Sequence, residues 1–300
     1  ATPVHASGLR PQVRSWLQPQ LEEFGLRLVA AGGTGVDDAE SADAPFYPGS
    51  PIGVSLVTGD LGFGATGTVT WVDGDRVYAF GHGFQDIGET LLPLSVAYVY
   101  SVVPKHDISF KVGAPIRQVG AMIQDRQSGV TGILGRDAPM VPVHVRIANE
   151  ATGHAEDFDL EIAANRTVFQ RMLILSIREA FSKAERTLGP NTKHFNLKVK
   201  LKGVEEVWSY GDALVAFDAG FSRVLITLVD RVMNHPTQRA EFERVELDVR
   251  IENVDRRASI EKVTASKDEV RSNEGPPKRR APFPFFSVTV ERTKSRTAER

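Results

Sequence analysis

The chain has 300 residues, of which 41% are hydrophobic and 25% charged, so it can bury one large core or two smaller ones, and we expect two globular parts. A net charge of −2, with basic and acidic residues interspersed, argues against a nucleic-acid-binding surface. The absence of cysteine excludes disulfides, thiolate nucleophiles and cysteine-ligated zinc, and no segment reaches the roughly 18 apolar residues of a membrane span.

Residues 1–47 predict a helix followed by a linker. Apolar residues recur at three- and four-residue spacing between residues 7 and 28, with Pro19 as the place of a bend and Gly25 as a stop. Residues 30–50 are rich in Gly, Ala and Asp and end in Pro48-Gly49, which is typical of a surface loop. Because the chain begins at Ala1 without methionine, we expect a processed or excised end there.

Residues 48–140 form short β-type runs broken by Gly, Pro and Asp-Gly, which predicts a small β-barrel or sandwich. Asp73-Gly74 lies between two such runs and predicts a tight hairpin, because this turn needs positive φ angles that these residues tolerate. His82 follows the second arm of the hairpin and lies between two glycines. Sparse side-chain cover there suits a proton acceptor that faces a substrate, although a histidine in an ordinary turn fits the pattern equally well.

Residues 141–266 alternate strand-like and helical patterns, which predicts an antiparallel sheet covered by two helices. The helices are expected at residues 168–188, capped by Asn165 or Thr167, and at residues 212–233. The strands are expected at residues 141–147, 158–162, 195–201, 242–251 and 258–263. Residues 267–300 become rich in proline and basic residues, so we expect a partly disordered tail with one short strand at 286–290 and a solvated basic run at Lys278-Arg279-Arg280.

Nucleotide and metal sites find little support in the sequence. Gly62, Gly64 and Gly67 match the glycine spacing of a dinucleotide fingerprint, but a strand pattern follows where a phosphate would need a helix N-terminus. We therefore expect these glycines to allow close approach of strands or a β-bulge. The seven histidines are scattered and form no set with metal-ligand spacing, so no metal and no cofactor are expected.

Nucleophilic catalysis requires a serine, a base within hydrogen-bond reach and usually an orienting carboxylate. His82 is the candidate base. The candidate carboxylates are Asp86, Asp107 and Asp125. Ser128 is the one serine of residues 48–140 that directly precedes a glycine in a turn-like context, but a polar turn residue fits it as well, and no serine lies in a glycine-rich oxyanion turn.

Several segments between Pro48 and Gly135 together carry a family resemblance. They are Gly59-Asp60, Ala65-Thr66-Gly67-Thr68-Val69-Thr70, Ala79-Phe80-Gly81-His82, Ser109-Phe110-Lys111-Val112-Gly113-Ala114-Pro115, Gln124-Asp125-Arg126 and Gly129-Val130-Thr131-Gly132-Ile133-Leu134-Gly135. This block resembles the SpoIVB-type serine peptidase domain, and above all the long bacterial members of unknown role. The resemblance is specific in this block and looser from Ala1 to about Lys267.

The resemblance implies a chymotrypsin-like double barrel that uses serine, histidine and aspartate, and it assigns the general base to His82. The family's serine lies in a Gly-Met-Ser-Gly-Ser-Pro motif that this sequence lacks, and in the long members we expect that motif upstream. The resemblance therefore implies an exported, periplasmic or extracellular protein that cleaves a protein or peptide substrate. It also suggests that the chain is the C-terminal product of self-processing near Ala1, inactive alone, with the upstream fragment as its partner.

The alternative is a non-catalytic structural or assembly module that keeps a peptidase-like scaffold. The missing serine motif favours it, as do the apolar strand at residues 91–103 and the aromatic segment Phe283–Phe286, either of which could dock on a neighbouring sheet edge or groove. Such a module could also form a homo-oligomer.

Overall fold

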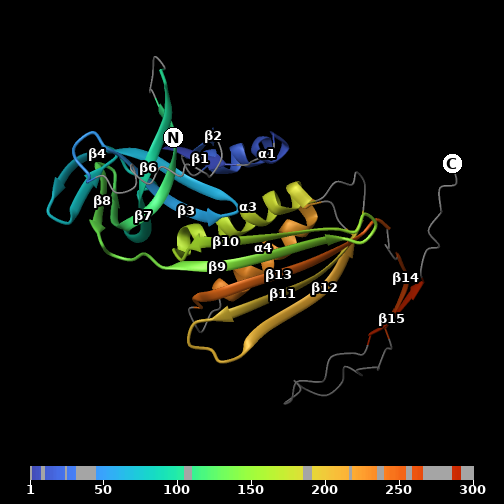
Figure 1. Ribbon diagram of the computed structural model, residues 1–300. Helices are drawn as coiled ribbons and strands as arrows, with labels where there is room; N and C mark the ends of the chain where they lie inside the picture. Colours follow the sequence, from blue (N-terminus) through green and yellow to red (C-terminus); the bar gives the residue numbers. More distant parts are fainter. Residues whose placement is uncertain are drawn as a thin grey trace, which may run out of the picture.

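The computed structural model shows two connected parts, one built mostly of strands and the other a sheet covered by helices (Figure 1). It describes residues 2–7, 11–23, 26–31, 45–104, 110–184, 191–215, 218–234, 240–254, 259–265 and 286–291. At the coarse level, the expected mixture of β and α+β architecture is confirmed.

Most of the described chain is β-strand. The strands are β1 (Thr2–Ser7), β2 (Leu26–Ala31), β3 (Pro51–Gly59), β4 (Gly62–Asp73), β5 (Arg76–Ala79), β6 (Gly88–Val103), β7 (Phe110–Arg126), β8 (Gly129–Leu134), β9 (Met140–Asn149), β10 (His154–Ala163), β11 (Thr192–Leu201), β12 (Val207–Val215), β13 (Phe242–Glu252), β14 (Ser259–Ala265) and β15 (Phe286–Glu291). The helices are α1 (Pro11–Glu22), α3 (Arg166–Ala184) and α4 (Asp218–Met233).

Six strands of the first part pair in a closed ring. β3 pairs with both β4 and β6, β6 pairs with β7, β7 with β8, β8 with β5, and β5 with β4. The order β6-β3-β4-β5 returns the fourth strand of the ring, β6, to the side of its first strand, β3, as in a Greek key. The hairpin expected at Asp73-Gly74 is confirmed: it joins β4 to β5, and Gly74 has a φ of 60°.

Glycines let the ring pack closely around Pro115 of β7 and Phe80. A Cβ atom on Gly53 would lie 3.0 Å from Pro115 Cγ, and one on Gly64 would lie 2.7 Å from it. A Cβ atom on Gly67 would overlap the ring of Phe80. Gly64 and Gly67 belong to the glycine-spaced segment described above, and the close approach expected there is confirmed.

The second part is a five-stranded sheet in the order β12-β11-β13-β9-β10, with α3 and α4 over one face (Figure 1). Its neighbouring strands are antiparallel except for β13 and β9, which are parallel. The expected all-antiparallel sheet is therefore wrong for this pair. The chain passes through α4 before β13 begins, so β13 enters the sheet in the same direction as β9.

Large apolar side chains fill the layer between these helices and the sheet. The rings of Phe181 on α3 and Phe221 on α4 lie 4.9 Å apart between centroids, and Phe195 on β11 lies 5.2 Å from Phe221. All three side chains are buried. The helix expected from residue 168 is confirmed as α3, and Asn165 caps it by accepting a hydrogen bond from the N–H of Thr167.

Two helix predictions need correction. The helix expected over residues 7–28 spans only Pro11–Glu22, and β1 and β2 on either side of it form a parallel pair that joins the ring at β4. The helix expected from residue 212 begins at Asp218, because residues 207–215 pair with β11 as β12. In both places strand pairing with distant residues overrides the local helical pattern.

The two parts are joined within one sheet. Residues 57–59 of β3 pair with residues 160–162 of β10, which connects the ring to the five-stranded sheet. The strand expected at residues 258–263 as part of the helix-covered sheet is present as β14, but it lies outside that sheet. It pairs with β15, the strand expected at residues 286–290, in a separate two-stranded sheet. Most of the linker predicted over residues 30–50, and residues 266–285 and 292–300 of the predicted tail, lie outside the described residues.

Candidate functional site

His82 lies on an exposed turn directly after β5. Phe80 and Gly81 both have a φ of 72°, so two successive left-handed residues turn the chain sharply out of the strand. The N–H of Phe80 donates to the carbonyl of Thr68 on β4, at 2.9 Å, and the rings of Phe80 and His82 lie 5.9 Å apart. The turn therefore presents the imidazole at the surface while its base stays attached to the ring of strands.

Asp125 is the buried anchor of the loop that follows His82. Its side chain lies near the end of β7 and is completely buried. One carboxylate oxygen accepts the N–H of Phe84 at 2.7 Å, and the other accepts the N–H groups of Gln85 at 2.8 Å and Ile87 at 3.3 Å. A buried carboxylate needs such donors, because nothing else replaces the water that it has lost.

The imidazole itself bonds to the backbone and not to a carboxylate. Nδ1 of His82 lies 2.7 Å from the carbonyl oxygen of Gly83. Among the described residues, Nε2 of His82 has no hydrogen-bond partner. The geometry therefore leaves Nε2 available to a group that approaches from outside.

The other candidates occupy different places around this loop. Asp86 is exposed with a φ of 57°, and its carboxylate lies so close to the α-carbon of Gly83 that a Cβ atom there would overlap it. Ser128 is exposed in the turn between β7 and β8, and the described residues show no hydrogen bond between it and His82. Asp107 lies outside the described residues. The structure thus brings Asp86 and Asp125 to the His82 loop.

Two backbone carbonyl groups that contribute to this site could not be predicted from the sequence. The carbonyl of Gln127, in the β7–β8 turn, accepts the N–H of Gly83 at 3.1 Å, and the carbonyl of Gly83 faces the imidazole. A backbone group can belong to any residue type, so residue patterns do not reveal it. The sequence feature that indicates a close contact here is Gly83 itself, since any side chain at this position would overlap Asp86.

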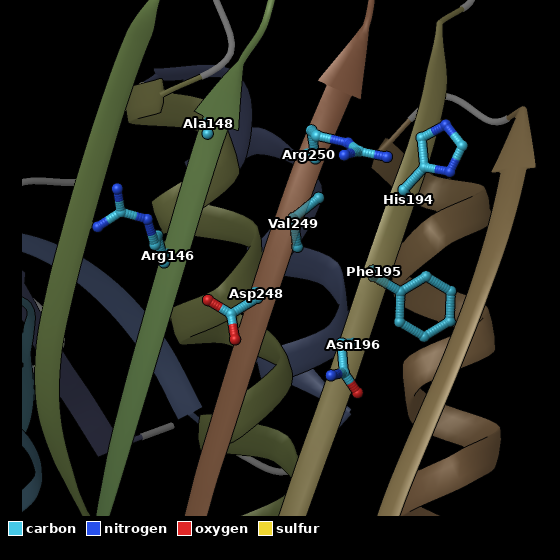
Figure 2. Close-up of a pocket in the computed structure, with 8 residues that line it drawn as sticks. All are labelled: Arg146, Ala148, His194, Phe195, Asn196, Asp248, Val249 and Arg250. Atoms are coloured by element: carbon cyan, nitrogen blue, oxygen red, sulfur yellow. The ribbon is translucent and has the colours of Figure 1, made fainter.

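A pocket lies on the face of the five-stranded sheet away from the helices. Figure 2 shows Arg146 of β9, Asp248 and Arg250 of β13, and His194 and Asn196 of β11 around a pocket of about 370 Å³. Both of its arginines are paired with carboxylates. Arg146 lies 3.0 Å from Asp157 and Arg250 lies 3.1 Å from Glu150, while Nε2 of His194 lies 3.0 Å from a carboxylate oxygen of Glu252. This pattern is typical of a solvated sheet face, so the His82 loop is the stronger candidate.

The described residues contain no group of three or more His, Asp or Glu side chains placed to hold a metal ion. None of the helices within the described residues is long and apolar enough to cross a membrane.

Comparisons with known proteins give little guidance. No family model matches the chain, and no curated protein is significantly similar to it. Among solved structures, staphylococcal superantigen-like protein 4 matches with 12% identity and a TM-score of 0.20, covering 67% of this chain and 89% of that one. A superantigen-like protein from Staphylococcus aureus in complex with sialyl-Lewis X matches with 8% identity and a TM-score of 0.21, covering 67% and 94%. TM-scores of this size carry no argument about fold or function.

Proposed function

We propose that this chain is the histidine-bearing part of a SpoIVB-type serine peptidase, in which His82 is the general base. One observation carries the proposal. The imidazole is exposed on a loop that a buried aspartate holds in place, with Nδ1 bonded to a backbone carbonyl and Nε2 without a hydrogen-bond partner among the described residues. A general base needs this combination of fixed orientation and an accessible lone pair.

The strand ring supports a chymotrypsin-like barrel. Six strands close through a Greek key, with His82 directly after the third strand and Asp125 near the end of the fifth. His82, just past the end of β5, and Asp125, on β7, lie at the same end of the ring, because residues 84–87 donate hydrogen bonds to Asp125. The described residues show no direct bond between this carboxylate and the imidazole, as a Ser-His-Asp triad would have.

The nucleophile of this proposal comes from another segment, upstream in the same precursor. The chain lacks the Gly-Met-Ser-Gly-Ser-Pro motif, and Ser128 shares no described hydrogen bond with His82. The serine would donate its hydroxyl proton to Nε2 of His82 and attack the carbonyl carbon of a protein or peptide substrate. An exported location and association with the upstream fragment belong to the same proposal.

A non-catalytic assembly module is the second candidate, and one observation favours it. The paired ends of β6 and β7 project from the ring (Figure 1), and Tyr100 and Val102 on β6 are 38% and 55% exposed. Exposed apolar side chains on a projecting hairpin are typical of a surface that meets a partner. This candidate requires no role for His82.

Replacement of His82 separates the two candidates. In the product of the complete coding sequence, we expect His82→Gln to slow processing or cleavage of a protein substrate by about 10²–10⁴-fold, the usual contribution of a general base. His154→Gln is the matched control, because the side chain of His154 is also exposed to solvent, beside a turn, and its imidazole bonds to the surface residue Glu156. Unchanged rates in His82→Gln would overturn the peptidase proposal and favour the assembly module.

A further inference from the structure

A single peptide group, the one between Gly83 and Phe84, lies between the candidate base and the buried carboxylate. Its carbonyl oxygen is 2.7 Å from Nδ1 of His82. Its N–H donates to a carboxylate oxygen of Asp125 at 2.7 Å. Asp125 and His82 are therefore connected through the two ends of one planar, conjugated unit.

The direction of each hydrogen bond follows from the groups involved. A carbonyl oxygen can only accept, so Nδ1 of His82 carries the proton. In the neutral imidazole, Nε2 then holds the lone pair. At the other end, the N–H of Phe84 donates to a carboxylate, and this charge-assisted bond draws electron density toward the carbonyl oxygen of the same peptide group. The carboxylate thus strengthens the acceptor that His82 uses.

We propose that Asp125 is a positioning residue that fixes the orientation and tautomer of His82 through the Gly83–Phe84 peptide group and without direct contact. We call this connection, from Asp125 through the peptide group to His82, the relay. Its consequence for catalysis rests on the proposed function, whereas the relay itself does not. In a peptidase of this kind, the peptide group would take the place of the direct bond between carboxylate and imidazole in a Ser-His-Asp triad.

The surroundings hold this peptide group in one orientation. On its N-terminal side, the N–H of Gly83 donates to the carbonyl of Gln127. On its C-terminal side, Gln85 and Ile87 donate to the second oxygen of Asp125. Rotation of the peptide would break the bonds to both His82 and Asp125, and the buried carboxylate has no access to water as a replacement.

The test is the tautomer of His82, measured by ¹⁵N NMR on the full chain with labelled histidine, at a pH where the imidazole is neutral. His82→Gln identifies the signals. We expect the native chain to hold the Nδ1–H form, although free histidine side chains in water prefer the Nε2–H form. In Asp125→Asn the carbonyl oxygen of Gly83 becomes a weaker acceptor for Nδ1–H of His82, and we expect the Nε2–H form to become the major one. Asp86→Asn removes the same charge from the same loop and should leave the tautomer unchanged.

An amide-to-ester replacement provides a second route if Asp125→Asn does not fold. An ester in place of the Gly83–Phe84 amide removes one N–H and weakens one carbonyl while it keeps every side chain. We expect it to shift the tautomer as Asp125→Asn does. The matched control is an ester between Phe84 and Gln85, which also removes one bond to Asp125 but does not touch the carbonyl at His82.

Each outcome decides the proposal. A native Nε2–H form, or a tautomer that does not respond to Asp125→Asn or to the ester at Phe84, would overturn the relay. A native Nδ1–H form that responds to these changes supports it. If that response is seen while His82→Gln leaves processing intact, the relay stands and only the proposed function fails.

Discussion

Around His82 the chain is held by hydrogen bonds to one buried carboxylate, whereas between α3 and the five-stranded sheet it is held by large apolar side chains. Asp125 accepts three backbone N–H groups of the loop. Phe181, Phe195 and Phe221, by contrast, pack ring against ring. The hydrogen bonds fix the orientation of the groups that they join, whereas the burial of apolar side chains stabilises the fold. The candidate site thus lies where hydrogen bonds specify the path of the backbone. The apolar layer that stabilises the fold lies in another part of the molecule.

The largest effect should come from the apolar layer. Phe181→Ala removes a buried ring that contacts Phe221, and we expect it to lower the free energy of unfolding by about 3–5 kcal/mol in a urea titration. Ile226→Ala on α4 is the control, because Ile226 is 37% exposed and its loss should change stability by about 0.5 kcal/mol. Equal effects of the two substitutions would contradict the assignment of the core to this layer.

A smaller loss is expected from the buried carboxylate. Asp125→Ala leaves three N–H groups without their acceptor, and we expect a cost of about 2–3 kcal/mol, since the loop lies near the surface and water can reach part of it. Hydrogen exchange should show the Phe84 and Gln85 amides exchanging faster, with the amides of α3 protected as before. Asp86→Ala, on the same loop, should leave those amides unchanged.

Overpacking at Gly67 should have an effect of about 1–3 kcal/mol. A Cβ atom at Gly67 overlaps the ring of Phe80, so Gly67→Ala must displace that ring from beneath the His82 turn. Adding Phe80→Leu to Gly67→Ala should recover part of the loss. If Gly67→Ala is as stable as the native chain by thermal unfolding, then Phe80 does not pack as described.

The smallest effect concerns Lys111 of β7, which donates to Thr68 Oγ1. Burial lowers the pKa of Lys111 below 10.5, because the interior disfavours the ammonium. The unfolded chain then binds more protons than the folded chain in the pH range just below 10.5, so stability should rise with pH there. Lys111→Met should remove this rise. A slope that persists in Lys111→Met would assign it to another group.

Local patterns could predict part of the molecule. Helix α3 has apolar residues at helical spacing along its length and a cap at Asn165, and the β4–β5 hairpin has an Asp-Gly turn, so neighbouring residues specify both elements. His82 was also accessible to sequence reasoning, since it follows that hairpin between two glycines. The roles of Gly64 and Gly67 followed from the strand pattern after them.

Other features depend on residues that are distant in the chain. Asp125 contacts a loop about forty residues earlier, and nothing in its own neighbourhood distinguishes it from Asp86 or Asp107 as the carboxylate that anchors that loop. The helical pattern that starts at Asp212 does not reveal that residues 212–215 belong to β12, which forms through its pairing with β11. The parallel pairing of β13 with β9 likewise depends on how the chain returns through α4. Such features need the three-dimensional arrangement.

The central claim is that His82 serves a serine supplied by another segment. The direct test is fluorophosphonate labelling of the material purified natively from cells that carry the complete coding sequence, with intact mass spectrometry to identify each polypeptide and each labelled serine. We expect a label on a serine of an upstream fragment that copurifies with this chain, and its loss in His82→Gln. An unlabelled assembly, or a label that persists in His82→Gln, would contradict it.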